Sequence, residues 1–216
     1  MDQVICTVDV VLLTLHEEEL KILLLQRELP PFAQQWALPG GFIHAQDADA
    51  EAAANRVLRD KTGLTAPYLE QLASFSGPQR DPRGWSVSIV YYALIGYALL
   101  MPSEQAQLHS VDQLPPLAFD HAEIIARTLA RLRSKSQYSS LPCYLLGEKL
   151  TLPQLQKVYE IVLGEKLNKS DFRRKIIEMD MLEELPGEFL KSGAFRPAQV
   201  YRLKTQQHLN LRQRGI

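Results

Sequence analysis

The segment at residues 40–64, GGFIHAQDADAEAAANRVLRDKTGL, constrains the fold of this chain more than any other part of it. It follows WALP, begins with two glycines and ends in TGL. Between these ends one side of a helical projection is apolar, and that side consists of Ala48, Ala52, Ala53, Val57 and Leu58. We therefore expect a helix over residues 47–61 that packs this side against a core.

Stretches rich in Val, Ile and Leu lie on both sides of this helix. VICTVDVVLLTL at residues 4–15 and LKILLLQRE, separated by the polar HEEE, predict two neighbouring strands. Residues 69–76 and 86–97 predict two more, with the loop GPQRDPRGW between them. The apolar residues of DHAEIIARTLARLRSK, at residues 120–135, recur with a helical period. Together these segments predict a sheet sandwiched between helices.

The C-terminal third of the chain predicts two helices followed by a hairpin. Thr151 and Pro153 are typical of a helix start, and QLQKVYEIVL continues to Gly164. After the short connection EKL, Asn168 can cap a second helix, KSDFRRKIIEM. MLEELP and QVYRLK then alternate apolar and polar residues as two strands. This order is that of a winged helix, whose second helix enters the major groove of DNA. The alternative is a small helical domain that mediates dimerisation.

The charge differs between the two parts of the chain. Residues 141–216 contain 13 Lys and Arg against nine Asp and Glu, whereas the preceding residues contain 11 against 16. The C-terminal part is therefore the basic one. Between the parts, SKSQYSSL loses the apolar period and gathers polar residues. We expect a first domain at residues 1–135, a linker at 136–147 and a second domain at 148–216.

Composition excludes several classes of protein. No apolar run approaches the roughly 20 residues that span a bilayer, and MDQVICTVDV lacks the basic and then apolar layout of a signal peptide. We therefore expect a cytoplasmic protein with no membrane partner. Cys6 and Cys143 lie far apart, without CxxC spacing or a nearby histidine pair, so we expect reduced core thiols.

Residues 40–64 resemble the Nudix box, in which G, five residues, E and seven residues precede REUxEExGU, where U is bulky and apolar. The positions of the box are taken here by Asp47, Arg56, Val57, Leu58, Asp60 and Lys61, with one extra residue after Asp47. In the family, the three closing acids share one helix face and bind Mg²⁺, which activates water. That face carries Val57, Asp60 and Lys61 here, so we expect neither a metal site nor catalytic residues.

The whole chain resembles the Nudix-related transcriptional regulators of the NrtR family. The segments that carry this resemblance are LLLQRELPPFAQQWALPGGF, RDPRGWSVSIVYYAL, FDHAEII and LTLPQLQKVYEIVLGEKLNKSDFRRKI. The resemblance implies an α+β protein, a Nudix α/β/α sandwich with a C-terminal winged helix-turn-helix domain. It also implies a homodimeric repressor that binds palindromic operator DNA, controls NAD metabolism and senses ADP-ribose or a related nucleotide, with no required cofactor.

The ligand groove implied by this resemblance lies beside WALPGGF. There the amides of Gly40 and Gly41 can approach a pyrophosphate because no Cβ obstructs them. Arginines can pair with its phosphates, Lys61 can supply the positive charge of the absent metal, and aromatic rings can stack on adenine. The expected ligand-binding residues are Arg27, Trp36, Gly40, Gly41, Phe42, Lys61, Arg83 and Trp85.

For DNA, we expect contacts from the second helix and from the hairpin that follows it. These contacts are Lys169, Ser170, Arg173 and Arg174 on the helix, and Lys191 and Arg196 in the hairpin. Nucleotide binding would change the placement of the two winged helices of a dimer through residues 120–135 and the linker.

Three alternatives stay open at this point. An active Nudix hydrolase, of the ADP-ribose pyrophosphatase type or with residual activity only, would need a metal site built from Asp47, Asp49, Glu51 and Asp60. A regulator of sugar utilisation would sense a sugar or a sugar phosphate. The sign of the response, repression or activation, is also not fixed by the sequence.

Overall fold

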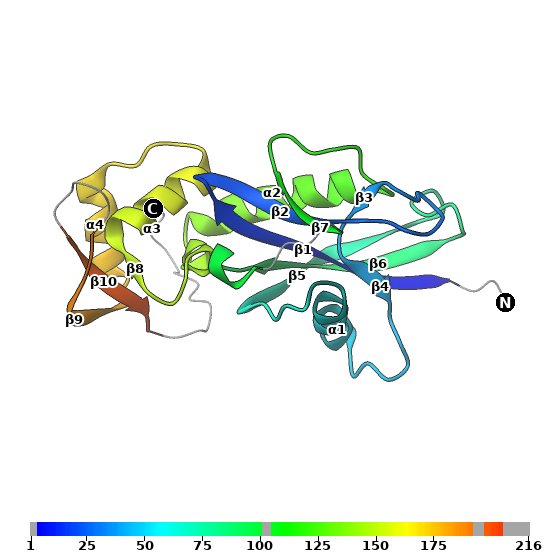
Figure 1. The fold of residues 1–216 in the computed structure, drawn as a ribbon, viewed down its shortest axis with the longest axis horizontal. Coiled ribbons are helices and arrows are strands. Elements are labelled where there is room, and N and C mark those ends of the chain that lie inside the picture. Colours follow the sequence, from blue (N-terminus) through cyan, green and yellow to red (C-terminus); the bar gives the residue numbers. More distant parts are fainter. Residues whose placement is uncertain (1–3, 101–104, 192–196, 205–216) are drawn as a thin grey trace. The chain divides into compact units, whose positions relative to one another are not determined.

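The computed structural model describes residues 4–100, 105–191 and 197–204 (Figure 1). The chain forms two compact units, each of which is treated separately. Of the described residues, the first unit comprises 4–14, 20–95, 99–100 and 105–130, and the second comprises 15–19, 96–98, 131–191 and 197–204. None of the helices in the described ranges is long and apolar enough to cross a membrane.

A seven-stranded sheet, counted over the described residues, forms the centre of the first unit. Its strands are β1 (Ile5–His16), β2 (Glu19–Gln26), β3 (Trp36–Ala37), β4 (Gly40–Phe42), β5 (Tyr68–Gly77), β6 (Ser86–Leu94) and β7 (Ala106–Ser110). The order is β3-β2-β1-β6-β5, with β4 paired to β1 and β7 to β2. Strands β1 and β6 are parallel, whereas β4 is antiparallel to β1, which brings the glycine pair beside the middle of β1.

Helices α1 (Ala50–Thr62) and α2 (His121–Ser136) lie on opposite sides of this sheet (Figure 1). Alternation along β1 directs Val8, Val10 and Leu12 into the core that contains the buried side of α1. Val57 belongs to that core at 2% exposure, and a Cβ on Gly41 would lie 3.0 Å from its Cγ2 atom. Position 57, which is acidic in the Nudix box, is therefore occupied here by an apolar side chain that packs in the core.

Helix α1 begins three residues later than the pattern indicates. The Asp49 carboxylate accepts a hydrogen bond of 2.7 Å from the Ala52 amide, and this N-cap starts the helix at Ala50. At the other end Gly63 adopts φ 72°, the left-handed conformation that ends many helices.

The expectation that both cysteines are core thiols is correct for Cys143, which is buried, and wrong for Cys6. Cys6 is exposed, because β1 enters the core only at Val8.

The second unit contains the expected winged helix. Its elements are η2 (Leu141–Leu145), β8 (Leu150–Thr151), α3 (Leu152–Leu163), α4 (Lys169–Glu178), β9 (Leu182–Leu190) and β10 (Ala198–Leu203), and η1 (Tyr97–Leu99) follows β6. A capping box between Thr151 and Gln154 starts α3, and Asn168 caps α4 by accepting from two amides. The strand order β8-β10-β9 completes the module, so the predicted fold class is confirmed.

The segment expected to be a linker, residues 136–147, is largely buried. The residues of η2 are buried, and the Tyr159 hydroxyl donates a hydrogen bond of 2.8 Å to the Ser139 carbonyl. The hydroxyls of Ser136 and Ser139 donate to helix carbonyls four residues earlier. These serine hydroxyls therefore form hydrogen bonds with backbone carbonyl groups at the C-terminal end of α2. The domain limits themselves stay predictions.

Replacing Val57 by glutamate, the family residue at this position, should lower the free energy of unfolding by about 3 kcal/mol. The change removes buried apolar contacts and places a carboxylate in hydrocarbon. Lys61→Glu is the matched control: Lys61 is exposed on the same helix, so its effect should stay within about 0.5 kcal/mol. Urea denaturation measures both, and equally small effects would contradict the packing of Val57.

Candidate functional site

A buried carboxylate, Asp9, lies in the middle of β1 beneath the glycine pair. It accepts a hydrogen bond of 2.6 Å from the Ser88 hydroxyl, and the guanidinium of Arg80 and Nε2 of His121 lie 3.8 and 3.6 Å from its oxygens. A Cβ on Gly40 would lie 2.1 Å from Asp9 Oδ1. Because that distance is far below any contact distance, glycine is required at position 40 as long as Asp9 stays in place.

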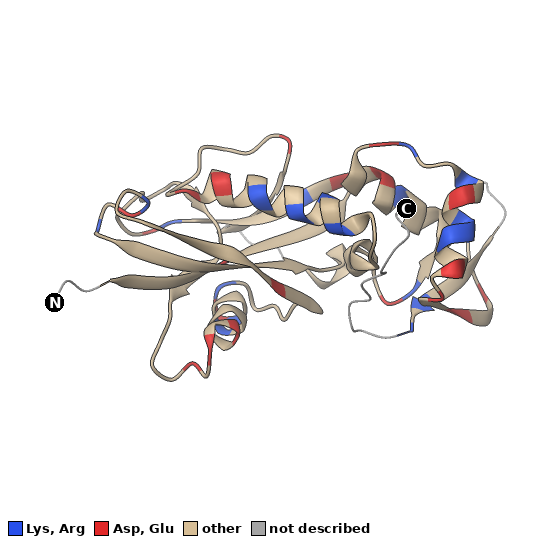
Figure 2. Cartoon of the chain, turned by 180° about the vertical axis from the view of Figure 1, so that it is seen from behind, with Lys and Arg blue, Asp and Glu red and all other residues tan. Residues whose placement is uncertain are grey.

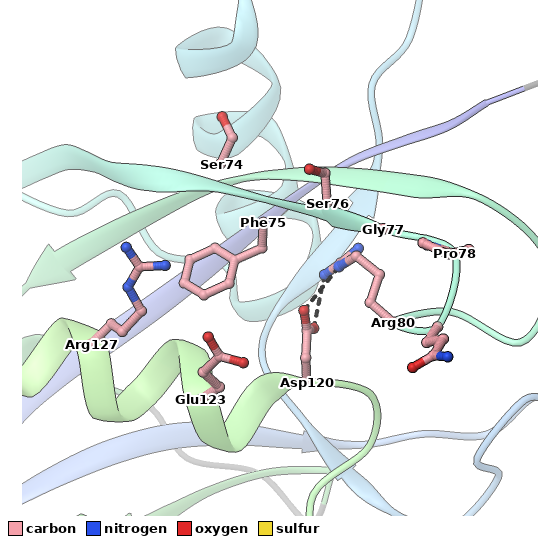
Figure 3. Close-up of a pocket in the computed structure, with 10 residues that line it drawn as sticks. Ser74, Phe75, Ser76, Gly77, Pro78, Arg80, Asp120, Glu123 and Arg127 are labelled. Carbon is pink, nitrogen blue, oxygen red and sulfur yellow. Dashed lines mark hydrogen bonds and ion pairs between the residues drawn. The ribbon is translucent and has the colours of Figure 1, made fainter.

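Arg80 connects this carboxylate to the start of α2. Its guanidinium donates two hydrogen bonds of 2.9 Å to the carboxylate of Asp120 and one of 3.3 Å to the Ser86 hydroxyl. Figure 3 shows the paired hydrogen bonds between Arg80 and Asp120. The Arg80 side chain is only 9% exposed. With two carboxylates beside it, this arginine supports the site structurally and offers no excess charge to a ligand.

His121 fixes the turn that precedes the glycines. Its Nδ1 atom accepts a hydrogen bond of 3.0 Å from the Leu38 amide, so the proton of a neutral ring lies on Nε2, which faces Asp9. Burial lowers the pKa of His121 below its ordinary value, which keeps the ring neutral at pH 7.

Two guanidinium groups lie over one phenyl ring next to this turn. The Cζ atoms of Arg27 and Arg83 lie 4.8 and 6.0 Å from the centroid of the Phe119 ring, and that of Arg83 also lies 5.4 Å from the Phe42 ring. Burial and the neighbouring Arg83 lower the pKa of Arg27. Two cations held together in this way favour an anion that can bridge them.

The two arginines differ in their own partners. Arg83 forms an ion pair of 2.7 Å with Asp81, whose pKa this pairing helps to lower. Arg27 donates only to the backbone carbonyls of Pro31 and Leu29, and no carboxylate in the described ranges forms an ion pair with it. Its charge is therefore available to a ligand anion.

The phenyl rings of this group rest on a strained backbone. Phe32 and Phe119 pack edge to face with centroids 4.8 Å apart, and both have positive φ, at 63° and 55°. Bulky residues rarely adopt this left-handed conformation, and such strain is concentrated at binding sites. Neither residue was among the expected ligand contacts, although Phe32 lies in LLLQRELPPFAQQWALPGGF and Phe119 in FDHAEII.

Trp36, Trp85 and Lys61 stay predicted ligand residues. Trp36 pairs with Gln26, next to Arg27, and its carbonyl accepts a hydrogen bond of 2.9 Å from the Ala118 amide, next to Phe119. The Trp36 ring packs edge to face on His109, with centroids 4.6 Å apart, and Trp85 is 47% exposed. Lys61 is exposed on α1. Over the described part of the chain, no hydrogen bond, ion pair or ring contact joins any of these three to Arg27 or Arg83. The structure thus brings together Arg27, Phe42 and Arg83 beside Gly40.

The acids of the box have structural partners. Asp47 accepts two hydrogen bonds of 2.7 Å from Arg56, which hold its pKa well below the ordinary value, and Asp49 caps α1. Asp60 lies 4.0 Å from the same arginine. The described residues contain no group of three or more His, Cys, Asp or Glu that could hold a metal ion. These side chains therefore do not fit Mg²⁺.

A separate cavity of about 560 Å³ opens between β5 and α2 (Figure 3). Its wall includes Phe75, with the Arg127 guanidinium 4.9 Å from the ring centroid, and the carboxylates of Asp120 and Glu123. Arg80 lies in this wall but is already paired. The cavity therefore offers less excess positive charge to a phosphate than the Arg27 group does.

Helix α4 of the second unit separates a core face from a charged face. Phe172 and Ile176 are buried, whereas the expected DNA contacts Lys169, Ser170 and Arg174 are exposed and Arg173 is half-buried. Figure 2 shows that both basic and acidic residues lie along this helix. Lys191, at the end of β9, is exposed, and Arg196 lies outside the described residues.

Comparison with known proteins identifies both units. A model of the Nudix domain matches residues 7–131, and one of the NrtR DNA-binding winged helix domain matches residues 142–203. The ADPR responsive transcriptional repressor NtrR of Acinetobacter baylyi is 42% identical, over 94% of this chain and 83% of that protein.

Two solved structures from Shewanella oneidensis are also similar. NrtR complexed with a 27mer DNA has a TM-score of 0.87 and 39% identity, covering 92% of this chain and 93% of that one. The Nudix domain of the same protein complexed with ADP ribose has a TM-score of 0.56 and 39% identity, covering 61% and 90%. The chain therefore belongs to the NrtR family, which joins a Nudix domain to a DNA-binding winged helix.

Proposed function

We propose that this protein is a transcriptional repressor whose binding to operator DNA is weakened by ADP-ribose. The observation that carries the proposal is the pair of guanidinium groups of Arg27 and Arg83 over the Phe119 ring, beside the glycine turn. The similar Acinetobacter protein is named as ADPR responsive, and the similar Shewanella structures contain DNA or ADP ribose.

ADP-ribose has the chemistry that this group of residues would recognise. Its diphosphate carries two negative charges, which suit Arg27 and Arg83, and its adenine has a flat face for Phe119 or Phe42. Gly40 and Gly41, whose missing side chains leave room for Asp9 and Val57, would hold the backbone of this turn next to the diphosphate. Because ADP-ribose is a fragment of NAD, the controlled genes would belong to NAD metabolism.

The Nudix unit would bind this ligand without cleaving it. Cleavage of a pyrophosphate in the family depends on Mg²⁺ held by converging carboxylates. Here Val57 fills the core, Asp47 is held by Arg56 and Asp49 caps the helix. We therefore propose a receptor with no metal requirement and no hydrolase activity.

For DNA, we propose that a homodimer presents two copies of α4 to a palindromic operator. A two-fold axis in the protein then matches the two-fold axis of the site. Lys169, Arg173 and Lys191 would contact phosphates, and Ser170 and Arg174 would lie closer to the base edges. Lys191 directly follows β9, where the wing of such a module contacts DNA.

Arg27→Ala and Arg83→Ala should each weaken ADP-ribose binding by about 10-fold or more, because a charge-assisted hydrogen bond contributes about 1.5–3 kcal/mol. Lys61→Ala should leave the affinity unchanged, since Lys61 lies on α1 without contact to either arginine. Isothermal titration calorimetry without metal measures all three. Loss of ADP-ribose affinity in Lys61→Ala together with unchanged affinity in Arg27→Ala would contradict the proposed position of the ligand site.

A separate incubation of the protein with ADP-ribose and Mg²⁺ tests for hydrolysis. Release of AMP would favour an active hydrolase instead of a receptor.

Lys169→Ala should weaken operator binding and reduce its salt dependence by about 0.9 in slope, because one phosphate is no longer neutralised. Arg174→Ala should weaken binding and relax the sequence preference, because it removes a contact near the base edges. The probe is a duplex selected by the parent protein from a random pool. Arg59→Ala, which removes a 65% exposed arginine of α1, is the control and should bind the duplex normally. Every variant should keep its ADP-ribose affinity. Unchanged operator binding by both α4 variants would exclude α4 as the recognition helix.

A further inference from the structure

One apolar side chain of α4 points away from the core. Ile177 is 70% exposed, whereas Phe172 and Ile176 on the same helix are 2% exposed. Ile177 shares the outer face with Ser170 and Arg174, because these residues are spaced i, i+4 and i+7. An aliphatic side chain at this exposure contributes little to the stability of the second unit. Single exposed aliphatic residues are common on protein surfaces, and what distinguishes Ile177 is that it shares a face with Ser170 and Arg174, the expected base contacts.

We infer that Ile177 contacts the C5-methyl group of a thymine in the operator and so helps to select its sequence. The inference rests on the proposed function, in which α4 enters the major groove. Thymine displays a methyl group there, next to its O4 acceptor, and apolar side chains pack against that methyl group. The contact would remove both apolar surfaces from water.

The charges around Ile177 favour DNA over another protein as its partner. Helix α4 carries four cations, Lys169, Arg173, Arg174 and Lys175, against two acids, Asp171 and Glu178, and a net positive charge of this kind brings a helix to the phosphates that border a groove. A protein partner that covered Ile177 through an apolar surface would also have to desolvate these charges.

The conformation of Arg174 leaves Ile177 uncovered. Arg174 donates a hydrogen bond of 3.0 Å to Asp171, one turn towards the N-terminus of α4, whereas Ile177 lies one turn towards the C-terminus. Both members of this ion pair are more than 60% exposed, so the pair is weak and Arg174 can still turn to a base. The outer face of α4 thus presents a polar contact, from Arg174, and an apolar contact, from Ile177, about one helical turn apart.

The test compares thymine with uracil, which lacks only the C5-methyl group. The probe is the duplex that the parent protein selects from a random pool, made with thymine throughout or with uracil at one thymine position at a time. We expect uracil at the contacted position of a half-site to weaken binding by the parent protein about fourfold, the value for one buried methyl group. Uracil at the other positions should have no such effect.

Ile177→Ala should bind the thymine duplex more weakly than the parent and should no longer distinguish thymine from uracil at that position. Ile177→Val, which keeps a branched side chain, should retain part of the discrimination. Leu99→Ala, which truncates a 57% exposed aliphatic residue outside the winged helix, should behave as the parent does. Thermal unfolding confirms that each variant is folded.

Equal binding of the thymine and uracil duplexes by the parent at every position would overturn the inference, and this comparison needs no variant. Discrimination that persists in Ile177→Ala would also overturn it. If Ile177→Ala instead changed only the sedimentation of the free protein, Ile177 would contact a second copy of the chain. Failure of the parent to select any sequence would remove the proposed function itself.

Discussion

The buried carboxylate of Asp9 is the feature on which the ligand-binding half of this protein depends. A charge at 7% exposure is tolerated only when its oxygens are paired, and here Ser88, Arg80 and His121 surround it. Through these partners it joins β1 and β6 to the start of α2. Its Oδ1 atom also leaves no room for a side chain at position 40, so this position of the turn beside the arginine pair must be glycine.

The same helix that forms a metal centre in Nudix enzymes has a different physical role in this chain. A carboxylate face on α1 would need water or a metal beside it, whereas Val57 lets the helix pack directly against Gly41. In the function we propose, Arg27 and Arg83, which come from other segments, would supply the positive charge instead. Fixed cations can hold a diphosphate but do not generate the activated water that cleavage requires.

Much of the fold could be predicted from local patterns. β1, β5, β6 and α2 each lie within three residues of their expected limits, because long apolar periods and helix caps are local features. The short strands β3, β4 and β7 were not predicted, since they form only by pairing with β1 and β2.

For the site, Arg27, Gly40 and Arg83 were among the expected residues. Phe119 and His121 were not, since their roles depend on contacts between distant segments.

We propose that ADP-ribose and operator DNA favour different states of one conformational equilibrium of this protein. Calorimetric titration of ADP-ribose into the protein, alone and saturated with its selected duplex, tests this coupling. We expect weaker ADP-ribose binding in the presence of the duplex, by the same factor by which ADP-ribose weakens duplex binding. Equal ADP-ribose affinity in the two titrations would contradict it.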